Sequence, residues 1–195
     1  MPPEASTDGR VARGERTRAA IITAFLDLLV EGRARPRAKE IAARAGVSVR
    51  SIFQHFEDLE SLRTDVVHIQ GQRIRPLLED LDTTGDLRNR ARSLAQQRAT
   101  LYEFIGPVRR SMRGEPSTAE SRGLAELALA LSEQVAAQFA PELAALPRDR
   151  RDPVAIGADV LCSFPAWDHL RAGLGLTVEQ ATLALATSLE QLVAT

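Results

Sequence analysis

The sequence is poor in the residues from which cross-linked, metal-bound or membrane-spanning proteins are built. It has a single cysteine, Cys162, which excludes a disulfide within the chain and argues against a zinc site built on cysteines. We expect Cys162 to be a small buried apolar residue, and a redox-sensing thiol is the alternative. No run of about 18 apolar residues occurs, so no membrane-spanning helix is expected. The N-terminal stretch MPPEASTDGRVARGERTR lacks the apolar core of a signal peptide, which predicts a cytoplasmic protein.

Aromatic residues are also scarce, at 4% of the chain, whereas alanine, leucine and arginine are abundant. This composition favours helices over sheets, because the small and unbranched residues lose little freedom in a helix. The chain has 195 residues, which suits one large domain or two small ones. We predict an all-α fold without strands.

Histidine is the third scarce residue type, with three in the chain. No Ser-His-Asp, phosphate-loop or Gly-rich dinucleotide pattern accompanies them. Asp65 and His68 have i, i+3 spacing, which we interpret as a surface pair. A di-metal site in a helical bundle needs Glu-x-x-His pairs, and these are absent. We therefore predict that the protein is not an enzyme and expect neither a metal nor another cofactor.

Charge is distributed unevenly along the chain, although the net charge is only −1. Residues 10–56 hold ten Lys or Arg against four Asp or Glu, whereas residues 57–195 hold fifteen against twenty. A basic first quarter followed by an acidic remainder indicates a polyanion-binding head on a body with another task. Chance variation of the surface is the alternative.

The pattern of apolar residues and helix-ending residues divides the chain into three parts. Residues 1–9 are predicted to be a disordered tail, residues 10–57 a three-helix head, and residues 58–195 a helical body. In the head we expect helices at 10–31 and 38–45, with Gly46 in a left-handed conformation after the second. Ser48 is the expected N-cap of the third helix, and Asp58 caps a long helix to about Leu81 that kinks or breaks at Pro76.

The body is predicted to be helical throughout. A helix over 86–105 is expected to end near Gly106-Pro107, with a short piece at 108–114. Ser117 and Glu120 form a capping box before a helix whose predicted inward residues are Leu124, Leu127, Ala128, Leu131, Val135 and Phe139. The stretch 141–153 is predicted to be a charged connector, followed by a helix to about Ala172 with a kink at Pro165. Thr177 and Gln180 cap the last helix.

The segment AARAGVSVRSIFQHF describes two short helices joined by a turn that contains glycine, which is a helix-turn-helix. Val49, Ile52, Phe53 and Phe56 follow the spacing of a buried stripe. Arg50, Ser51, Gln54 and His55 occupy another face, which we expect to enter the major groove of DNA. Lys39 and His55 suit the sugar-phosphate backbone. The alternative is an ordinary pair of surface helices with a solvated polar face.

The segment AKEIAARAGVSVRSIFQHFEDLESL resembles the DNA-binding signature of the TetR family of transcriptional regulators. The resemblance is specific over residues 17–62 and rests on length and helical layout beyond them. It implies a homodimer that binds an inverted-repeat operator in double-stranded DNA. The DNA contacts it implies are Arg37, Ala38, Lys39, Ser48, Val49, Arg50, Ser51, Phe53, Gln54 and His55.

Three positions depart from the family pattern. Phe53 stands where the family often has tyrosine, so a phosphate contact through a phenol is missing. Leu59 stands where a lysine often reaches a phosphate. Arg37 replaces the usual Thr or Ser cap, and its charge can supply a different phosphate contact. We expect altered anchoring to the DNA backbone, with the function retained.

The resemblance further implies that residues 58–195 bind an unknown small-molecule effector and hold the dimer together through helices at about 153–172 and 177–194. The effector shifts the population toward a form that does not span two half-sites. Pro76 is either a hinge or a tolerated kink. Leu127 and Leu131 are alternatively plain core, and Phe164 and Trp167 are alternatively interface residues. The candidate pocket residues are Tyr102, Phe104, Ile105, Met112, Leu127, Leu131, Phe164 and Trp167.

Two functions remain open at this point. The first is a ligand-responsive transcriptional regulator, by family default a repressor. The second is a helical protein-interaction module whose helix-turn-helix is vestigial. Arg50 and Gln54 favour the first, because a vestigial motif has no reason to keep side chains that read bases.

Overall fold

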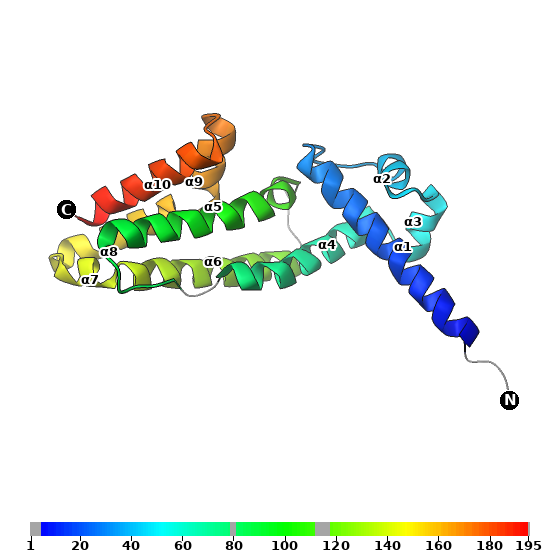
Figure 1. The fold of residues 1–195 in the computed structure, drawn as a ribbon, viewed down its shortest axis with the longest axis horizontal. Coiled ribbons are helices and arrows are strands. Elements are labelled where there is room, and N and C mark those ends of the chain that lie inside the picture. Colours follow the sequence, from blue (N-terminus) through cyan, green and yellow to red (C-terminus); the bar gives the residue numbers. More distant parts are fainter. Residues whose placement is uncertain (1–4, 79–80, 112–117, 195) are drawn as a thin grey trace. The chain divides into compact units, whose positions relative to one another are not determined.

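The computed structural model describes residues 5–78, 81–111 and 118–194, and every regular element within these ranges is a helix (Figure 1). No strand occurs among the described residues, so the all-α prediction is confirmed. The chain divides into two compact units. The N-terminal unit is Met1–Gln72 with Pro107–Pro116, and the C-terminal unit is Arg73–Gly106 with Ser117–Thr195.

The N-terminal unit has α1 (Ala5–Val30) packed on α2 (Ala38–Ala45) and α3 (Val49–His55). The second helix has the predicted bounds. The inner face of α1 is also as predicted, because its periodic apolar residues lie in the core. These buried residues are Ile21, Phe25, Leu28 and Leu29.

The first helix begins earlier than the sequence suggested. It starts at Ala5 and not near Arg10, so the expectation of a disordered tail is wrong for residues 5–9. Once a helix is nucleated, each added residue gains a hydrogen bond at little further cost. Pro2 and Pro3 lie outside the described residues.

The N-terminal unit also extends past residue 57, where the head was predicted to end. It includes most of α4 (Leu59–Ile74), whose Leu62 and Val66 are fully buried. Asp58 caps this helix as predicted, since its Oδ1 accepts the N–H of Ser61 at 2.7 Å. Arg18 of α1 forms an ion pair with Asp65 of α4. The apolar contacts and the ion pair make the start of α4 part of the head.

The predicted break at Pro76 is confirmed. The α-helix ends at Ile74, and a single 3₁₀ turn, Arg75–Leu78, follows it. Proline has no N–H with which to continue the α-helical hydrogen-bond pattern, and its ring crowds the preceding turn.

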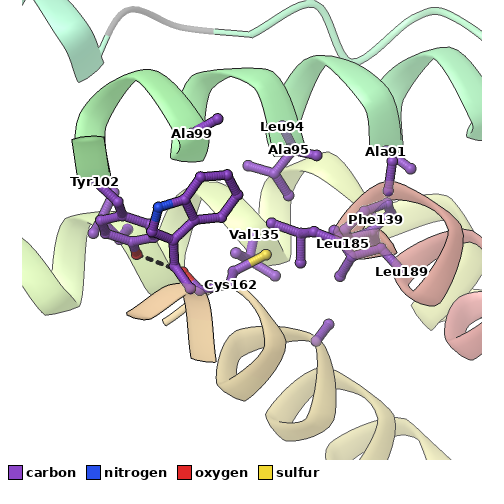
Figure 2. Close-up of a cluster of buried hydrophobic side chains, with 14 of the residues drawn as sticks. Ala91, Leu94, Ala95, Ala99, Tyr102, Val135, Phe139, Cys162, Leu185 and Leu189 are labelled. Carbon is purple, nitrogen blue, oxygen red and sulfur yellow. Dashed lines mark hydrogen bonds between the residues drawn. The ribbon is translucent and has the colours of Figure 1, made fainter. Parts of the chain in front are cut away.

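In the C-terminal unit, α5 (Leu87–Ser111) contributes its residues up to Gly106 to a core of small and medium apolar side chains. Figure 2 shows Ala91, Leu94, Ala95, Ala99 and Tyr102 of this helix facing Val135, Phe139, Cys162, Leu185 and Leu189. The other α-helices of the unit are α6 (Thr118–Gln138), α7 (Ala140–Ala145), α8 (Arg148–Leu161), α9 (Phe164–Asp168) and α10 (Val178–Val193), and a π-helical turn, η2 (His169–Gly173), follows α9.

The predicted caps late in the chain are confirmed. Thr177 accepts the N–H of Gln180 at 3.2 Å, while the Gln180 amide oxygen accepts the N–H of Thr177 at 2.9 Å. The predicted kink at Pro165 is a full break: Ser163 caps the short helix α9, which has Pro165 in its first turn. Ser117, of the other predicted capping box, lies outside the described residues.

The helix predicted to end near Gly106-Pro107 instead continues to Ser111, with Pro107 inside it. A proline inside a helix costs about 3 kcal/mol. Here Gly106 and Val108 on either side are buried, and the Ser111 hydroxyl donates to the Val108 carbonyl at 2.7 Å. Burial of Gly106 and Val108 offsets the cost of the proline. A rule based on local sequence does not include this burial. Ala128 was also placed inward by periodicity, but it is exposed.

The charged stretch 141–153 is not a connector. It contains most of α7 and the start of α8, which begins at Arg148. Pro141 lies in the first turn of α7, where its missing N–H is not needed. Arg151 then donates to the carbonyls of Leu143 at 2.9 Å and Ala144 at 3.0 Å. This arginine satisfies the carbonyl groups that are left without partners at the end of α7.

A buried ion pair links α5 to α7. Arg90 is only 4% exposed, and its guanidinium makes a two-point contact with the Glu142 carboxylate. It also donates to the carbonyls of Gly85, at 2.8 Å, and Gln138. The charge of Arg90 is therefore compensated, and each of its three guanidinium nitrogens has an acceptor.

Substitution of Glu142 tests the energetic weight of this pair. Glu142→Ala leaves the Arg90 charge buried without its partner and is expected to lower the free energy of unfolding by about 3 kcal/mol. Urea denaturation followed by circular dichroism measures the change. Glu126→Ala removes the same charge from the exposed face of α6 and is the control, with an expected effect within about 0.5 kcal/mol. Equal stabilities of the two variants would contradict a structural role for the pair.

The environment of Cys162 predicts an inert thiol. The residue is 3% exposed, and burial raises its pKa to about 12. The reactive thiolate is then about one part in ten thousand at pH 8. We expect the folded protein to resist an aromatic disulfide reagent at this pH and to react stoichiometrically once unfolded in guanidinium. Rapid labelling of the folded protein would instead support the redox-sensing alternative.

Candidate nucleic-acid interface

The turn between α2 and α3 begins at a glycine in a left-handed conformation, as predicted. Gly46 has φ of 67° and ψ of 31°, and its N–H donates to the Ala42 carbonyl. The Val47 N–H donates to the same carbonyl at 3.0 Å. A side chain at residue 46 would meet nothing within 4 Å. Backbone conformation, and not lack of space, is therefore the reason for glycine here.

The third helix begins two residues later, at the cap predicted for it. The Ser48 hydroxyl oxygen accepts the N–H of Ser51 at 3.0 Å, and its carbonyl accepts that of Ile52 at 3.3 Å. The helix ends at His55, after which Phe56 is extended. Hydrogen bonds at Gly46 and Ser48 thus complete the end of α2 and the start of α3 within three residues. The abrupt change of helix holds α3 at an angle to α2.

The buried side of α3 is narrower than predicted. Ile52 and Phe56 are 0% and 4% exposed, and Val49 is half-buried. Phe53, which was assigned to the same stripe, is 49% exposed, so that assignment is wrong. Phe53 lies about 100° around the helix from Ile52, and a helix of two turns presents only one side to the rest of its unit.

The ring of Phe56 is held in place from α1. The guanidinium of Arg18 lies over it, 5.3 Å from the ring centre, while the same guanidinium pairs with Asp65. A cation over an aromatic face is attracted by the ring's electrons. This contact fixes the end of α3 in the core and leaves the opposite side of the helix outward.

The outward side of α3 carries Arg50, Phe53 and Gln54, all of them exposed. Ser51 is half-buried, and its N–H is used by the Ser48 cap. His55 was predicted to share this face but is half-buried, with its ring beside Gly14 of α1. The predicted face is thus present in part: two side chains able to read bases stand on it, and the histidine faces α1.

The start of α2 has a different cap from the family pattern. Arg37 stands at the N-cap, and its side chain has no acceptor atom for a backbone N–H. Glu40 contributes a cap from inside the helix, because its carboxylate accepts the N–H of Arg37 at 2.8 Å. The side chains of Arg37 and Lys39 are exposed, and Ala38 is half-buried. Two cations therefore stand where the resemblance places phosphate contacts.

Two arginines of the head form ion pairs with carboxylates of the same unit. Arg18 pairs with Asp65, and Arg44 pairs with Glu31 at 2.8 Å. The hydrogen bond from Arg44 lowers the pKa of Glu31. Both members of the second pair are exposed, so the pair stabilises the fold little. Arg37, Lys39 and Arg50, in and next to α2 and α3, are exposed as well.

The aromatic pocket candidates are brought together in the C-terminal unit, but as a packed cluster. The Tyr102 ring lies 5.7 Å from that of Phe164 and 6.4 Å from that of Trp167. The Tyr102 hydroxyl donates to the Cys162 carbonyl, and the Trp167 indole donates to Glu103 at 3.0 Å. Protein partners thus satisfy the polar atoms of both rings.

The remaining described pocket candidates belong to the same apolar core or pack against it. Ile105 and Leu131 are buried, and Phe104 and Leu127 are half-buried. Met112 lies outside the described residues. Leu131 belongs to the core cluster, which agrees with its alternative interpretation as plain core.

Two grooves in the C-terminal unit lie away from these candidates. The first has a volume of about 510 Å³ and is lined by Leu77, Leu81, Arg92, Ser93, Gln96, Gln97 and Thr100. The second has a volume of about 430 Å³ and is lined by Leu78, Leu81, Thr83, Ala130, Glu133, Gln134, Ala137 and Gln138. Sequence reasoning missed both, because polar residues on one side of α5 or α6 are indistinguishable from a solvated helix face.

Over the ranges that the structure describes, no cluster of three or more His, Cys, Asp or Glu side chains could hold a metal ion. None of the helices in these ranges combines the length and apolar character needed to cross a membrane. The chain matches no known protein-family model, and no curated protein is significantly similar to it in sequence.

Proposed function

We propose that this protein is a transcriptional regulator that binds double-stranded DNA by placing α3 in the major groove. The observation that carries the proposal is the geometry of α3. Ile52 and Phe56 hold the helix to its unit, while Arg50 and Gln54 are exposed on the other side. Arginine pairs bidentately with guanine and glutamine with adenine. The TetR resemblance over residues 17–62 supports the same assignment.

Backbone contacts position the helix over the bases. Arg37 and Lys39 are exposed near the N-terminal end of α2, where they can approach phosphates. Phe53 has no hydroxyl for a phosphate but is 49% exposed beside Gln54. An apolar ring at this position suits the methyl group of thymine. Phe53 is therefore proposed as a base contact in place of a phosphate contact.

An apolar surface supports association of two copies of the chain. Ile156 and Val160, one turn apart on α8, are 64% and 58% exposed, and Leu183 on α10 is 61% exposed. Helices α8 and α10 pack on each other, with Gly157 close to Leu192. Exposed aliphatic residues at this spacing are typical of a surface that is covered in the assembled protein. We propose a homodimer formed through α8 and α10, which reads an inverted repeat.

The regulator is proposed to act in the cytoplasm as a repressor that a small molecule releases from its operator. The effector binds the C-terminal unit and favours the form with low affinity for DNA. It can do so only through different affinities for the two forms. The rival function, a protein-interaction module, uses the same exposed residues of α3 on a protein partner.

The Arg50→Ala variant tests the DNA assignment. An operator is first obtained by selecting bound fragments of the source genome with the purified protein. Arg50→Ala is expected to weaken operator binding by about 1–3 kcal/mol and to relax discrimination at one base pair. Fluorescence anisotropy at fixed salt measures both effects. Arg122→Ala removes the same charge from the exposed face of α6 and should leave affinity unchanged. Selection of no inverted repeat, or equal affinities of both variants, would favour the protein-interaction module.

The Val160→Glu variant tests the dimer. A charge at the centre of the proposed interface is expected to convert a dimer to a monomer, because the carboxylate would be desolvated on association. Sedimentation velocity at micromolar concentration measures the state. Leu129→Glu places the same charge at an equally exposed leucine of α6 and should remain dimeric. A monomeric wild type, or dissociation of both variants alike, would show that α8 and α10 do not form the interface.

A further inference from the structure

Residues 32–39, which join α1 to α2 and begin α2, hold four cations and no acidic residue. We call this stretch the basic loop. Two of its cations, Arg37 and Lys39, are proposed phosphate contacts, whereas Arg33 and Arg35 have no part in the proposed function. All four side chains are exposed. A concentration of one sign of charge on an exposed surface attracts the opposite charge.

The middle of the basic loop is held to the head by Pro36. Its side chain is buried, while Arg35 and Arg37 on either side of it are exposed. The backbone is extended at Arg37, with φ of −85° and ψ of 153°, and a proline favours the same conformation at the residue before it. Successive side chains of an extended segment point to opposite sides. Burial of Pro36 therefore places Arg35 and Arg37 together on the outward side.

The beginning of the basic loop is fixed to the end of α1. Gly32 has a left-handed backbone, with φ of 86°, and its N–H donates to the Leu29 carbonyl at 3.0 Å. The N–H of Arg33 donates to the Leu28 carbonyl at 2.9 Å. These two hydrogen bonds are the pattern by which a left-handed residue closes a helix. The backbone of Arg33 is therefore anchored to α1, while its side chain is exposed.

The two carboxylates that flank the basic loop have other partners. Glu31 pairs with Arg44 of α2 at 2.8 Å, and Glu40 accepts the backbone N–H of Arg37 at 2.8 Å. The pKa of Glu31 is lowered chiefly by the hydrogen bond from Arg44, whereas the charge of Arg33 contributes least. Even with both carboxylates counted against the four cations, residues 31–40 have a net charge of +2. The surplus positive charge is available to an anion outside the chain.

We propose that the basic loop binds the phosphate backbone of double-stranded DNA, with Arg33 and Arg35 continuing the phosphate contacts of Arg37 and Lys39. This inference rests on the proposed function, because it takes duplex DNA as the polyanion. An extended segment separates alternate side chains by about 6–7 Å, so neighbouring cations of the loop can reach different phosphates of one strand. Such contacts position the head without reading sequence.

The double variant Arg33→Gln/Arg35→Gln of the full-length protein tests the proposal. Its affinity for the selected operator and for an unrelated duplex of equal length is measured by fluorescence anisotropy over a range of salt concentrations. Binding to both duplexes should weaken by the same factor, because both carry the same phosphates. The slope of log affinity against log salt should become shallower by about 1.8 for each bound head, which is about tenfold between 50 and 200 mM salt.

Two comparison variants separate phosphate contacts from other effects. Arg92→Gln/Arg122→Gln removes the same two charges from exposed positions of α5 and α6 and should leave affinity and slope unchanged. Gln54→Ala removes a proposed base-reading side chain without changing the charge. It should weaken binding to the operator alone and leave the salt slope as in the wild type.

A second measurement uses chemically altered DNA. Single phosphates of the operator are replaced in turn by neutral methylphosphonates. The wild type should lose affinity at one or more positions where the Arg33→Gln/Arg35→Gln variant loses none, because the variant has already lost those contacts. Identical profiles for the two proteins would overturn the assignment.

The outcomes distinguish the basic loop from the DNA assignment as a whole. Affinity and slope of the loop variant equal to those of the control would overturn the loop proposal and leave the DNA assignment standing. Loss confined to the operator would contradict a phosphate contact. Absence of duplex binding by the wild type would overturn both proposals. Loop-dependent binding to a labelled polyglutamate peptide that exceeds binding to the duplex would assign the loop to an acidic protein partner instead.

Discussion

The backbone conformation at Gly46 is the constraint on which the geometry of the proposed DNA-binding face depends. A left-handed residue ends α2, and the Ser48 hydroxyl caps α3 two residues later. A residue with a Cβ in this conformation costs about 1–2 kcal/mol, so glycine makes the abrupt change of direction possible. The angle between the two helices lets Ile52 reach the core while Arg50 stays outside. A continuous helix through this segment could not divide its residues in the same way.

Two buried arginines on α5 are held by different kinds of partner. Arg90 has a carboxylate and two carbonyls as partners, which fix α5 to α7. Arg98 is more deeply buried but is held by amides and one carbonyl, and one of its nitrogens has no acceptor. Neutral partners orient a guanidinium without neutralising it. Arg90 is therefore held by an opposite charge, whereas the hydrogen bonds of Arg98, two turns later, to Gln97, Gln134 and Leu131 go to neutral groups.

Several sequence predictions failed where tertiary contacts override local rules. The rule that proline ends a helix failed at Pro107, because buried residues on both sides keep α5 intact. The prolines and charges of the stretch 141–153 predicted a connector. Instead, Arg151 donates hydrogen bonds to the last carbonyls of α7 and so stabilises the end of that helix. Periodicity placed Phe53 inside, but the short helix α3 buries only a narrow side. Each failure concerns which neighbour lies nearby, and local sequence rules contain no such information.

Residue types and their spacing were enough to predict the helical class, the bounds of α2, the turn at Gly46 and the caps at Ser48, Asp58 and Thr177. These features depend on interactions between residues at most four positions apart, so residue type and spacing suffice to predict them. Only tertiary packing makes His55 face α1, packs the aromatic candidates as core, and buries Arg98 with no ion pair among the described residues. Those outcomes depend on segments distant in the chain, whose approach is fixed only when the whole unit packs.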